Sequence, residues 1–423
     1  MTGMPRRLLV DISHTLGTPH YTGIQRYVRH TLRQAMALDQ QARLGGVAPA
    51  VPSVGAIAAD DQGRWRSVRV LPAHPLEGLP PLRLPALDEP GVGDVLAQHG
   101  THVLLADRFW HTHAWRALDT LLASPATITL VVYDLISLRH PEWFAAGVGE
   151  RFARYLHRVL PHVRQVVCLS GQVRQDLRGW MAAEGLAPVP ILVVAPGHQV
   201  WSPGWRNHPE AVHVNPPEGL PPSWLEGRER FVLQVGTLEP RKNHLLSWQA
   251  MQHLWSDGRT EGLLVIGQPG WLTGDFCRTL REAAAATRET AGQGRAPRVV
   301  WLAECTDAEL DWCYRHAAAV LYPSSSEGYG LPRAEAAALG TPVVASDTAV
   351  HREVAAQAGG AICWTALHPA AMAATVQYVL DAARPAPPPH APRSWALATR
   401  ELVAAMGPGD ASQPGGVIPG LWA

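Results

Sequence analysis

The residues best suited to chemistry form one stretch, SSSEGYGLPRAE, at positions 324–335. A β-rich run leads into this stretch, and a helix is expected to begin with Pro332 in its first turn. Glycine lets the backbone approach a ligand closely, and the free N–H groups of a helix start favour an anion. The pattern predicts a phosphate on the amides of Tyr329 to Leu331, with Glu327 and Glu335 facing neutral hydroxyls. A plain turn with two solvated glutamates is the alternative, and the surrounding pattern disfavours it.

A second candidate is FVLQVGTLEPRKNH at positions 231–244. Its β-rich run ends at Gly236, and a helix is expected from Asn243, a favourable N-cap residue. Arg241 and Lys242 then lie in a loop at the carboxyl end of a strand. A guanidinium binds two phosphate oxygens and an ammonium adds a movable point charge, so the pair suits a diphosphate. The alternative, two solvated cations, is disfavoured because the glutamate motif is expected at the same sheet edge.

Short apolar runs alternate with helical patterns, which predicts a parallel α/β architecture. The alternation breaks at a Pro-rich segment, residues 201–227, which predicts a linker between two domains. Ser170 and Thr306 are expected to cap helices. The expected strands are Leu8–Ile12, Val103–Ala106, Ile128–Tyr133, Val166–Leu169, Ile191–Ala195, Phe231–Val235, Gly262–Ile266, Val299–Leu302, Ala319–Tyr322 and Pro342–Ala345.

The motifs VGTLEPRKNH and SSSEGYGLPRAE, together with LLVIGQPGW and SWALATRELV, resemble the retaining nucleotide-sugar glycosyltransferases of the GT-B fold, in glycosyltransferase family 4. The resemblance implies two facing, Rossmann-like, doubly wound domains. An acceptor domain would span residues 1–226 and a donor domain residues 227–393. Residues 394–423 would form a helix crossing back to the first domain and a mobile tail.

The resemblance also assigns roles in the donor site. Arg241 and Lys242 would contact the diphosphate, Glu327 the sugar hydroxyls, and Glu335 the ribose. The complete expected donor set is Gly236, Arg241, Lys242, Glu327, Gly328, Tyr329, Gly330, Leu331 and Glu335.

On the acceptor side, the segment around Thr22 and Gly23 resembles the start of bacterial polysaccharide glycosyltransferases. An ordinary helix-start turn is an equally good interpretation of those two residues. Many relatives carry His-Asp where this chain has Tyr133 and Asp134: either Tyr133 hydrogen-bonds in place of that histidine, or the acceptor geometry differs. Asp134 and the departing diphosphate are both candidates for deprotonating the acceptor.

The composition sets further limits. Acidic and basic residues number 36 each, which argues against a nucleic-acid partner. The apolar run near the N-terminus is too short for a signal peptide, and no segment is apolar enough to span a bilayer. We therefore expect a cytoplasmic protein, with peripheral contact at the inner face of the membrane compatible with the sequence. Oligomeric state is left open.

The motifs that are missing restrict the chemistry. The sequence has no Asp-x-Asp metal clamp, no P-loop and no dinucleotide fingerprint. We expect no cofactor and no metal, with a GDP- or UDP-sugar as substrate. The favoured activity is hexosyl transfer, with mannose as the best guess, to a glycan or lipid-linked acceptor of a bacterial surface polysaccharide such as lipopolysaccharide. A nucleotide-sugar epimerase and a binding protein without catalysis are the two alternatives.

Overall fold

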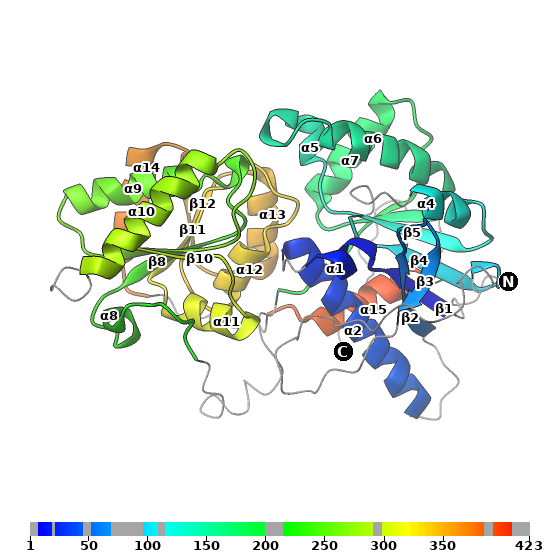
Figure 1. Cartoon of the computed structure of the whole chain (residues 1–423), viewed down its shortest axis with the longest axis horizontal. Coiled ribbons are helices and arrows are strands. Elements are labelled where there is room, and N and C mark those ends of the chain that lie inside the picture. The colour runs from blue at the N-terminus through cyan, green and yellow to red at the C-terminus, as the bar shows by residue number, and fades with distance from the viewer. Residues whose placement is uncertain are drawn as a thin grey trace. The chain divides into compact units, whose positions relative to one another are not determined.

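The computed structural model describes residues 7–18, 22–44, 52–68, 96–108, 115–198, 215–290, 298–384 and 392–407. Within them the chain forms two compact units, shown in Figure 1. The first unit contains residues up to Leu138, Gly149–Gly197, and the chain from Trp395. The second contains Arg139–Val148 and His198–Ser394. Much of the predicted linker and the tail beyond Gly407 lie outside the described residues.

The first unit is built on a seven-stranded sheet in the order β3-β2-β1-β4-β5-β6-β7. All neighbouring strands are parallel except β2 and β3, which form an antiparallel pair. The strands are β1 Arg7–Asp11, β2 Ser53–Ala59, β3 Trp65–Val68, β4 Thr101–Leu105, β5 Thr127–Val132, β6 Gln165–Cys168 and β7 Ile191–Val193. The helices are α1 Ser13–Gly17, α2 Gly23–Leu44, α4 Trp115–Leu122, α5 Ile136–Arg139, α6 Val148–Val159, α7 Gly171–Ala183 and α15 Trp395–Ala405.

The second unit is built on a six-stranded parallel sheet in the order β10-β9-β8-β11-β12-β13. The strands are β8 Phe231–Val235, β9 Gly262–Ile266, β10 Val299–Leu302, β11 Ala319–Tyr322, β12 Val343–Ser346 and β13 Ile362–Thr365. The helices are α8 Pro222–Leu225, α9 His244–Ser256, α10 Gly274–Thr290, α11 Asp307–His316, α12 Leu331–Ala338, α13 Ala349–Ala358 and α14 Pro369–Asp381. The predicted α/β class with parallel sheets is confirmed.

Both faces of the second sheet are covered by helices, which agrees with the mainly apolar residues of its strands. Side chains of α9, α10 and α14 form one core cluster with the sheet. Trp224 and side chains of α11 and α12 form a second cluster on the other face (Figure 1). Packing on both faces fixes the strands, so the loops at their carboxyl ends have rigid supports.

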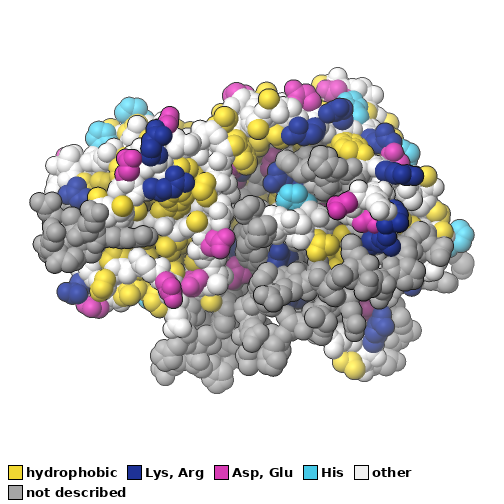
Figure 2. All heavy atoms as spheres, in the orientation of Figure 1, with side chains coloured by type: hydrophobic (Ala, Val, Ile, Leu, Met, Phe, Trp, Pro, Cys, Tyr) yellow, Lys and Arg dark blue, Asp and Glu magenta, His cyan; other side chains and the backbone are white. Residues whose placement is uncertain are grey.

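The surface carries no field of a single sign on the face drawn in Figure 2, where basic and acidic side chains are interspersed. This distribution agrees with the balanced charge of the whole chain. In the described part of the chain we find no helix whose length and hydropathy would let it cross a bilayer.

Close approach of two loops in the second unit requires a glycine. A Cβ atom added at Gly267 would lie 2.0 Å from the carbonyl oxygen of Gly236, far inside van der Waals contact. We predict that Gly267→Ala pushes apart the loops after β8 and β9 and destabilises the protein by several kcal/mol, roughly 2–5. Gly274→Ala, which meets no atom within 4 Å, is the control. Thermal unfolding checks this, and equal melting temperatures for the two variants would contradict it.

Candidate donor site

The candidate site lies where the second sheet changes its winding direction. β8 lies between β9 and β11, so the strand order reverses beside β8. In doubly wound sheets, ligands bind at the carboxyl ends of the strands that flank such a point. The loop after β8 carries Arg241 and Lys242, and the loop after β11 carries Glu327. The structure thus brings together the two motifs that the sequence singled out.

Glu327 forms ion pairs with both cations. Its Oε1 lies 2.5 Å from Nζ of Lys242, and its Oε2 lies 2.9 Å from Nη1 of Arg241. Nη2 of Arg241 lies 2.6 Å from Oε1 of Glu239. We call Glu239, Arg241, Lys242 and Glu327 the charge quartet. With two carboxylates and two cations, the quartet has no net charge when all four groups are ionised.

Burial and pairing act in opposite directions on the groups of the quartet. Burial alone would raise the pKa of Glu327, but Arg241 and Lys242 together hold that pKa well below its usual range. Burial lowers the pKa of Lys242, and Glu327 opposes this effect. We take Glu327 to be a carboxylate and Lys242 an ammonium, because two nearby cations stabilise the negative charge. Glu327 can therefore accept hydrogen bonds at any physiological pH.

Hydrogen bonds fix the loop after β8 to the loop after β11. The amide of Ser325 donates to the carbonyl of Arg241 at 2.8 Å, and Nη1 of Arg241 donates to the carbonyl of Ser326 at 2.8 Å. Asn243 stands at the start of α9 in the left-handed conformation, with φ 54°, and makes no side-chain cap there. Its Nδ2 instead donates to the carbonyl of Pro323 at 2.7 Å. The predicted helix start is correct, but the side chain of Asn243 connects the two loops.

The start of α12 supports the predicted anion site. Gly330 occupies the N-cap position with φ 92°, a conformation that favours glycine. A Cβ atom there would lie 3.2 Å from the hydroxyl of Tyr322. Within the described residues no side-chain hydrogen bond caps this helix at Gly330, so the helix-start amides, apart from Pro332, which has no N–H, can serve a ligand. Leu331 and Pro332 begin the helix, as predicted.

The remaining predicted donor residues are buried or half-buried. Gly328 and Tyr329 are buried, whereas Gly236 is half-buried beside the side chain of Lys242. The carboxylate of Glu335 is completely buried and accepts a hydrogen bond from the hydroxyl of Tyr314 at 2.9 Å. Its expected contact with ribose stays a prediction.

The predicted acceptor residues lie in the first unit, at the carboxyl edge of its sheet. Thr22 hydrogen-bonds Gln25 through its amide and its hydroxyl, at the start of α2, and Gly23 is exposed. The hydroxyl of Tyr133 donates to the carbonyl of Ala106 at 2.5 Å, and burial raises the pKa of Tyr133 well above its usual value. Asp134 accepts from the amide of Ile136 at 3.0 Å, at the start of α5.

The sequence reasoning missed a buried carboxylate pair at this edge. Asp11 ends β1, and Asp107 follows the neighbouring strand β4, where the strand order of the first sheet reverses. Oδ2 of Asp107 accepts from the amide of Thr15 at 2.6 Å, whereas Oδ2 of Asp11 has no hydrogen-bond partner among the described residues. Burial, and then the charge of Asp107, raise the pKa of Asp11 to about 7. An aspartate at or just after the end of each of two apolar runs was the signal available in the sequence.

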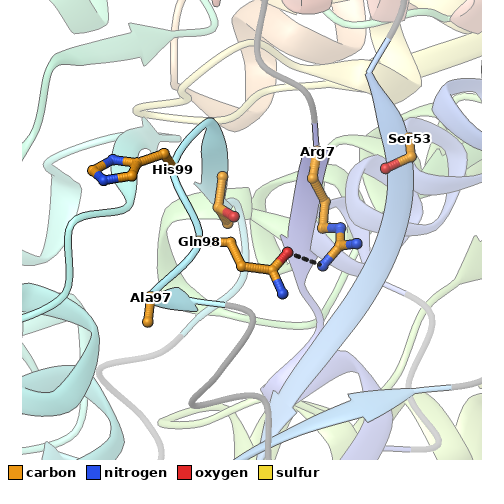
Figure 3. Close-up of a pocket in the computed structure, with 6 residues that line it drawn as sticks. Arg7, Ser53, Ala97, Gln98 and His99 are labelled. Atoms are coloured by element: carbon orange, nitrogen blue, oxygen red, sulfur yellow. Dashed lines mark hydrogen bonds between the residues drawn. The ribbon is translucent and has the colours of Figure 1, made fainter.

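A hollow at the opposite edge of the first sheet is separate from the buried carboxylate pair and from the charge quartet. It is lined by residues at the amino ends of β1, β2 and β4, including Arg7, Ser53 and Thr101. Figure 3 shows Arg7 donating to Gln98 across it, at 3.3 Å. Ligands of doubly wound sheets bind at the carboxyl edge, so this hollow is not the expected substrate site. Among the described residues, no group of three or more His, Cys, Asp or Glu side chains could hold a metal ion.

Residues 221–389 match the family described as Glycosyl transferases group 1. The serotype-specific mannosyltransferase WbdA of Escherichia coli is 29% identical over 247 residues, 56% of this chain and 28% of that protein. The chain therefore spans less than a third of the first relatives it matches. The D-inositol 3-phosphate glycosyltransferase of Segniliparus rotundus is 26% identical over 81% of this chain and 74% of its own length.

Solved structures share the fold over most of the chain. The crystal structure of Anabaena Alr3699/HepE in complex with UDP and glucose has a TM-score of 0.52 at 13% identity, covering 95% of each chain. Sucrose-phosphate synthase from Thermosynechococcus elongatus has a TM-score of 0.54 at 18% identity, with the same coverage. The predicted GT-B fold and the resemblance to bacterial polysaccharide-type glycosyltransferases are confirmed.

The carboxylate pair of the first unit generates a pH prediction. In the folded protein Asp11 keeps its proton up to about pH 7, whereas an unfolded aspartate releases it near pH 4. Between these values the unfolded state binds fewer protons, so Asp11 makes stability fall as pH rises. We predict that Asp11→Asn, which keeps an oxygen for the hydrogen bonds from Ser13, gains stability over the native chain as pH rises from 4 to 8. The gain should be on the order of a few kcal/mol.

Denaturant unfolding at several pH values checks this prediction. Asp61→Asn provides a control, because it removes one carboxylate at an exposed position outside the buried pair. Parallel stability curves for Asp11→Asn and the native chain would contradict the raised pKa.

Proposed function

We propose that this chain, whose residues 221–389 match the group 1 glycosyl transferases, moves a hexosyl group from a nucleoside-diphosphate sugar to a glycan or glycolipid acceptor. The observation that carries the proposal is the charge quartet beside the start of α12, at the winding reversal of a parallel sheet. Cations and free helix amides suit a diphosphate, and a buried, ionised glutamate suits sugar hydroxyls.

The donor diphosphate would replace the carboxylate of Glu327 in the ion pairs with Arg241 and Lys242. Without ligand, Glu327 occupies the cationic groups that a diphosphate would use. Phosphate oxygens that replace its carboxylate on Arg241 and Lys242 would free Glu327 to accept hydrogen bonds from the sugar. The two events are coupled, because a buried carboxylate that loses its cations needs new donors.

The quartet would act on the departing group. When the bond between the sugar and the diphosphate breaks, negative charge grows on the diphosphate. Cations held in place before the reaction stabilise that charge without reorganisation. Arg241 and Lys242 are held by the hydrogen bonds to the loop after β11, so they meet this requirement.

The finer specificity is proposed from the relatives. Mannose is the proposed sugar, because WbdA and the O-antigen chain mannosyltransferase B of Escherichia coli are named as mannosyltransferases. We place the reaction in bacterial surface polysaccharide synthesis, on the cytoplasmic side, with retention of anomeric configuration. Release of GDP from GDP-mannose that depends on an added acceptor tests the transferase proposal. Donor consumption without acceptor, giving only an isomer or free sugar, would favour the epimerase alternative.

Substitution of the cations should reduce turnover more than binding. We predict that Lys242→Ala and Arg241→Ala each lower kcat about 100- to 1000-fold at saturating donor. The physical reason is that these groups interact most strongly with the charge that develops in the transition state. Steady-state nucleotide release measures the effect. Arg278→Ala, a change at an exposed ion pair on α10, is the control and should stay near the native rate. Turnover within a few-fold of native in both variants would reject this placement of the diphosphate.

Chelation should leave the reaction intact. Two cations and a helix start are proposed to replace the divalent metal that many sugar transferases use. We predict that the rate in excess EDTA equals the rate without it. Loss of nucleotide release in EDTA, with recovery on adding Mg²⁺ or Mn²⁺, would overturn the metal-free mechanism.

A further inference from the structure

Arg333 is a buried cation that the charge quartet does not include. It is the third residue of α12, and its side chain is 0% exposed. Within the described part of the chain, none of its three guanidinium nitrogens has a hydrogen-bond partner. A buried charge without a partner is strongly destabilising, so a guanidinium kept in this state points to a ligand that completes it.

Burial lowers the pKa of Arg333, and the side chains that act most on its charge are the phenols of Tyr322 and Tyr329. Burial raises the pKa of Tyr322 well above its usual value and that of Tyr329 to about 12, so both are uncharged at neutral pH. The hydroxyl of Tyr329 is itself buried without a hydrogen-bond partner in the described structure. Neither phenol neutralises the guanidinium, and a second unused hydrogen-bonding group lies beside it.

Arg333 also lies near the diphosphate site. Side chains of a helix point toward its N-terminus, so a residue at the third position extends toward the first amides of α12. Tyr322, which acts on the charge of Arg333, lies against Gly330 at the helix start. The hydroxyl of Tyr322 accepts a hydrogen bond from Nζ of Lys242 at 3.4 Å. Tyr322 thus interacts with both Arg333 and Lys242 of the quartet.

The charge of the quartet leaves a requirement that Arg333 can meet. Glu239 and Glu327 neutralise Arg241 and Lys242, so these four residues offer a diphosphate no net positive charge. A ligand that brings two or more negative charges into a buried site needs further cations. Resting on the proposed function, we propose that Arg333 binds the donor diphosphate and supplies the net positive charge of its site.

The test compares ligand-free stability with nucleotide affinity. We expect Arg333→Leu to bind GDP and UDP about 10- to 100-fold more weakly than the native chain, the loss typical of a charged hydrogen bond. Binding of guanosine and uridine, which carry no phosphate, should be unchanged. The ligand-free melting temperature should stay the same or rise, because an unpartnered buried charge is removed. Isothermal titration calorimetry and thermal unfolding give these quantities.

Controls separate this proposal from the general function. Arg352→Leu removes an exposed cation of the same unit, which is paired with Asp347, and should bind nucleotides like the native chain. Should Arg333→Leu not fold, Arg333→Gln removes the charge with less change in shape, and the same comparison decides. Native affinity for GDP and UDP in the Arg333 variant, or a lower melting temperature with unchanged affinity, would overturn the role of Arg333 alone. A native chain that binds neither nucleotide would overturn the proposed function and this inference with it.

Discussion

The double ion pair of Glu327 is the interaction on which the candidate site depends. It joins the loop after β8 to the loop after β11, more than 80 residues apart in the chain. A carboxylate this deeply buried is tolerated only if cations and hydrogen bonds compensate its charge. The positions of Arg241 and Lys242 are therefore set by the fold before any ligand binds, and the backbone bond from Ser325 to Arg241 holds the same geometry.

This constraint gives the ligand-free site its electrostatic character. The cations are not solvated, which agrees with the sequence-based prediction, but they form ion pairs with Glu239 and Glu327, which the sequence did not predict. A phosphate must compete with Glu327, so affinity depends on what the exchange gains over the existing pairs. Phosphate binding would give a new partner to the amides at the start of α12 and to the guanidinium of Arg333. Neither would give up an existing partner among the described residues. Net attraction for an anion comes from them.

Much of the second unit could be predicted from the sequence. The strands β8, β9, β10 and β11 begin and end where the apolar runs predicted, because buried parallel strands need continuous apolar residues. The caps at Ser170 and Thr306 are confirmed, since capping depends on local chemistry alone. The strands β2, β3 and β13 were missed: β3 and β13 have only four residues each, and small or polar residues interrupt the apolar pattern of β2. The pairing of Glu327 with both cations was missed because sequence spacing does not reveal which charges meet across a sheet edge.

In the first unit, the resemblance identifies residues at the carboxyl edge of the sheet, but it does not establish what each side chain does there. Tyr133, where many relatives carry histidine, uses its hydroxyl on the carbonyl of Ala106, which fixes the end of β5 to the end of β4. Asp134 accepts a hydrogen bond from the backbone amide of Ile136 at the start of α5. Both side chains thus make a structural hydrogen bond, and their predicted roles toward an acceptor stay predictions. Within the described residues, Oδ2 of Asp11 is a buried polar atom at this edge without a hydrogen-bond partner, and no motif distinguished this residue. Register between β1 and β4, a tertiary property, is what brings Asp11 beside Asp107.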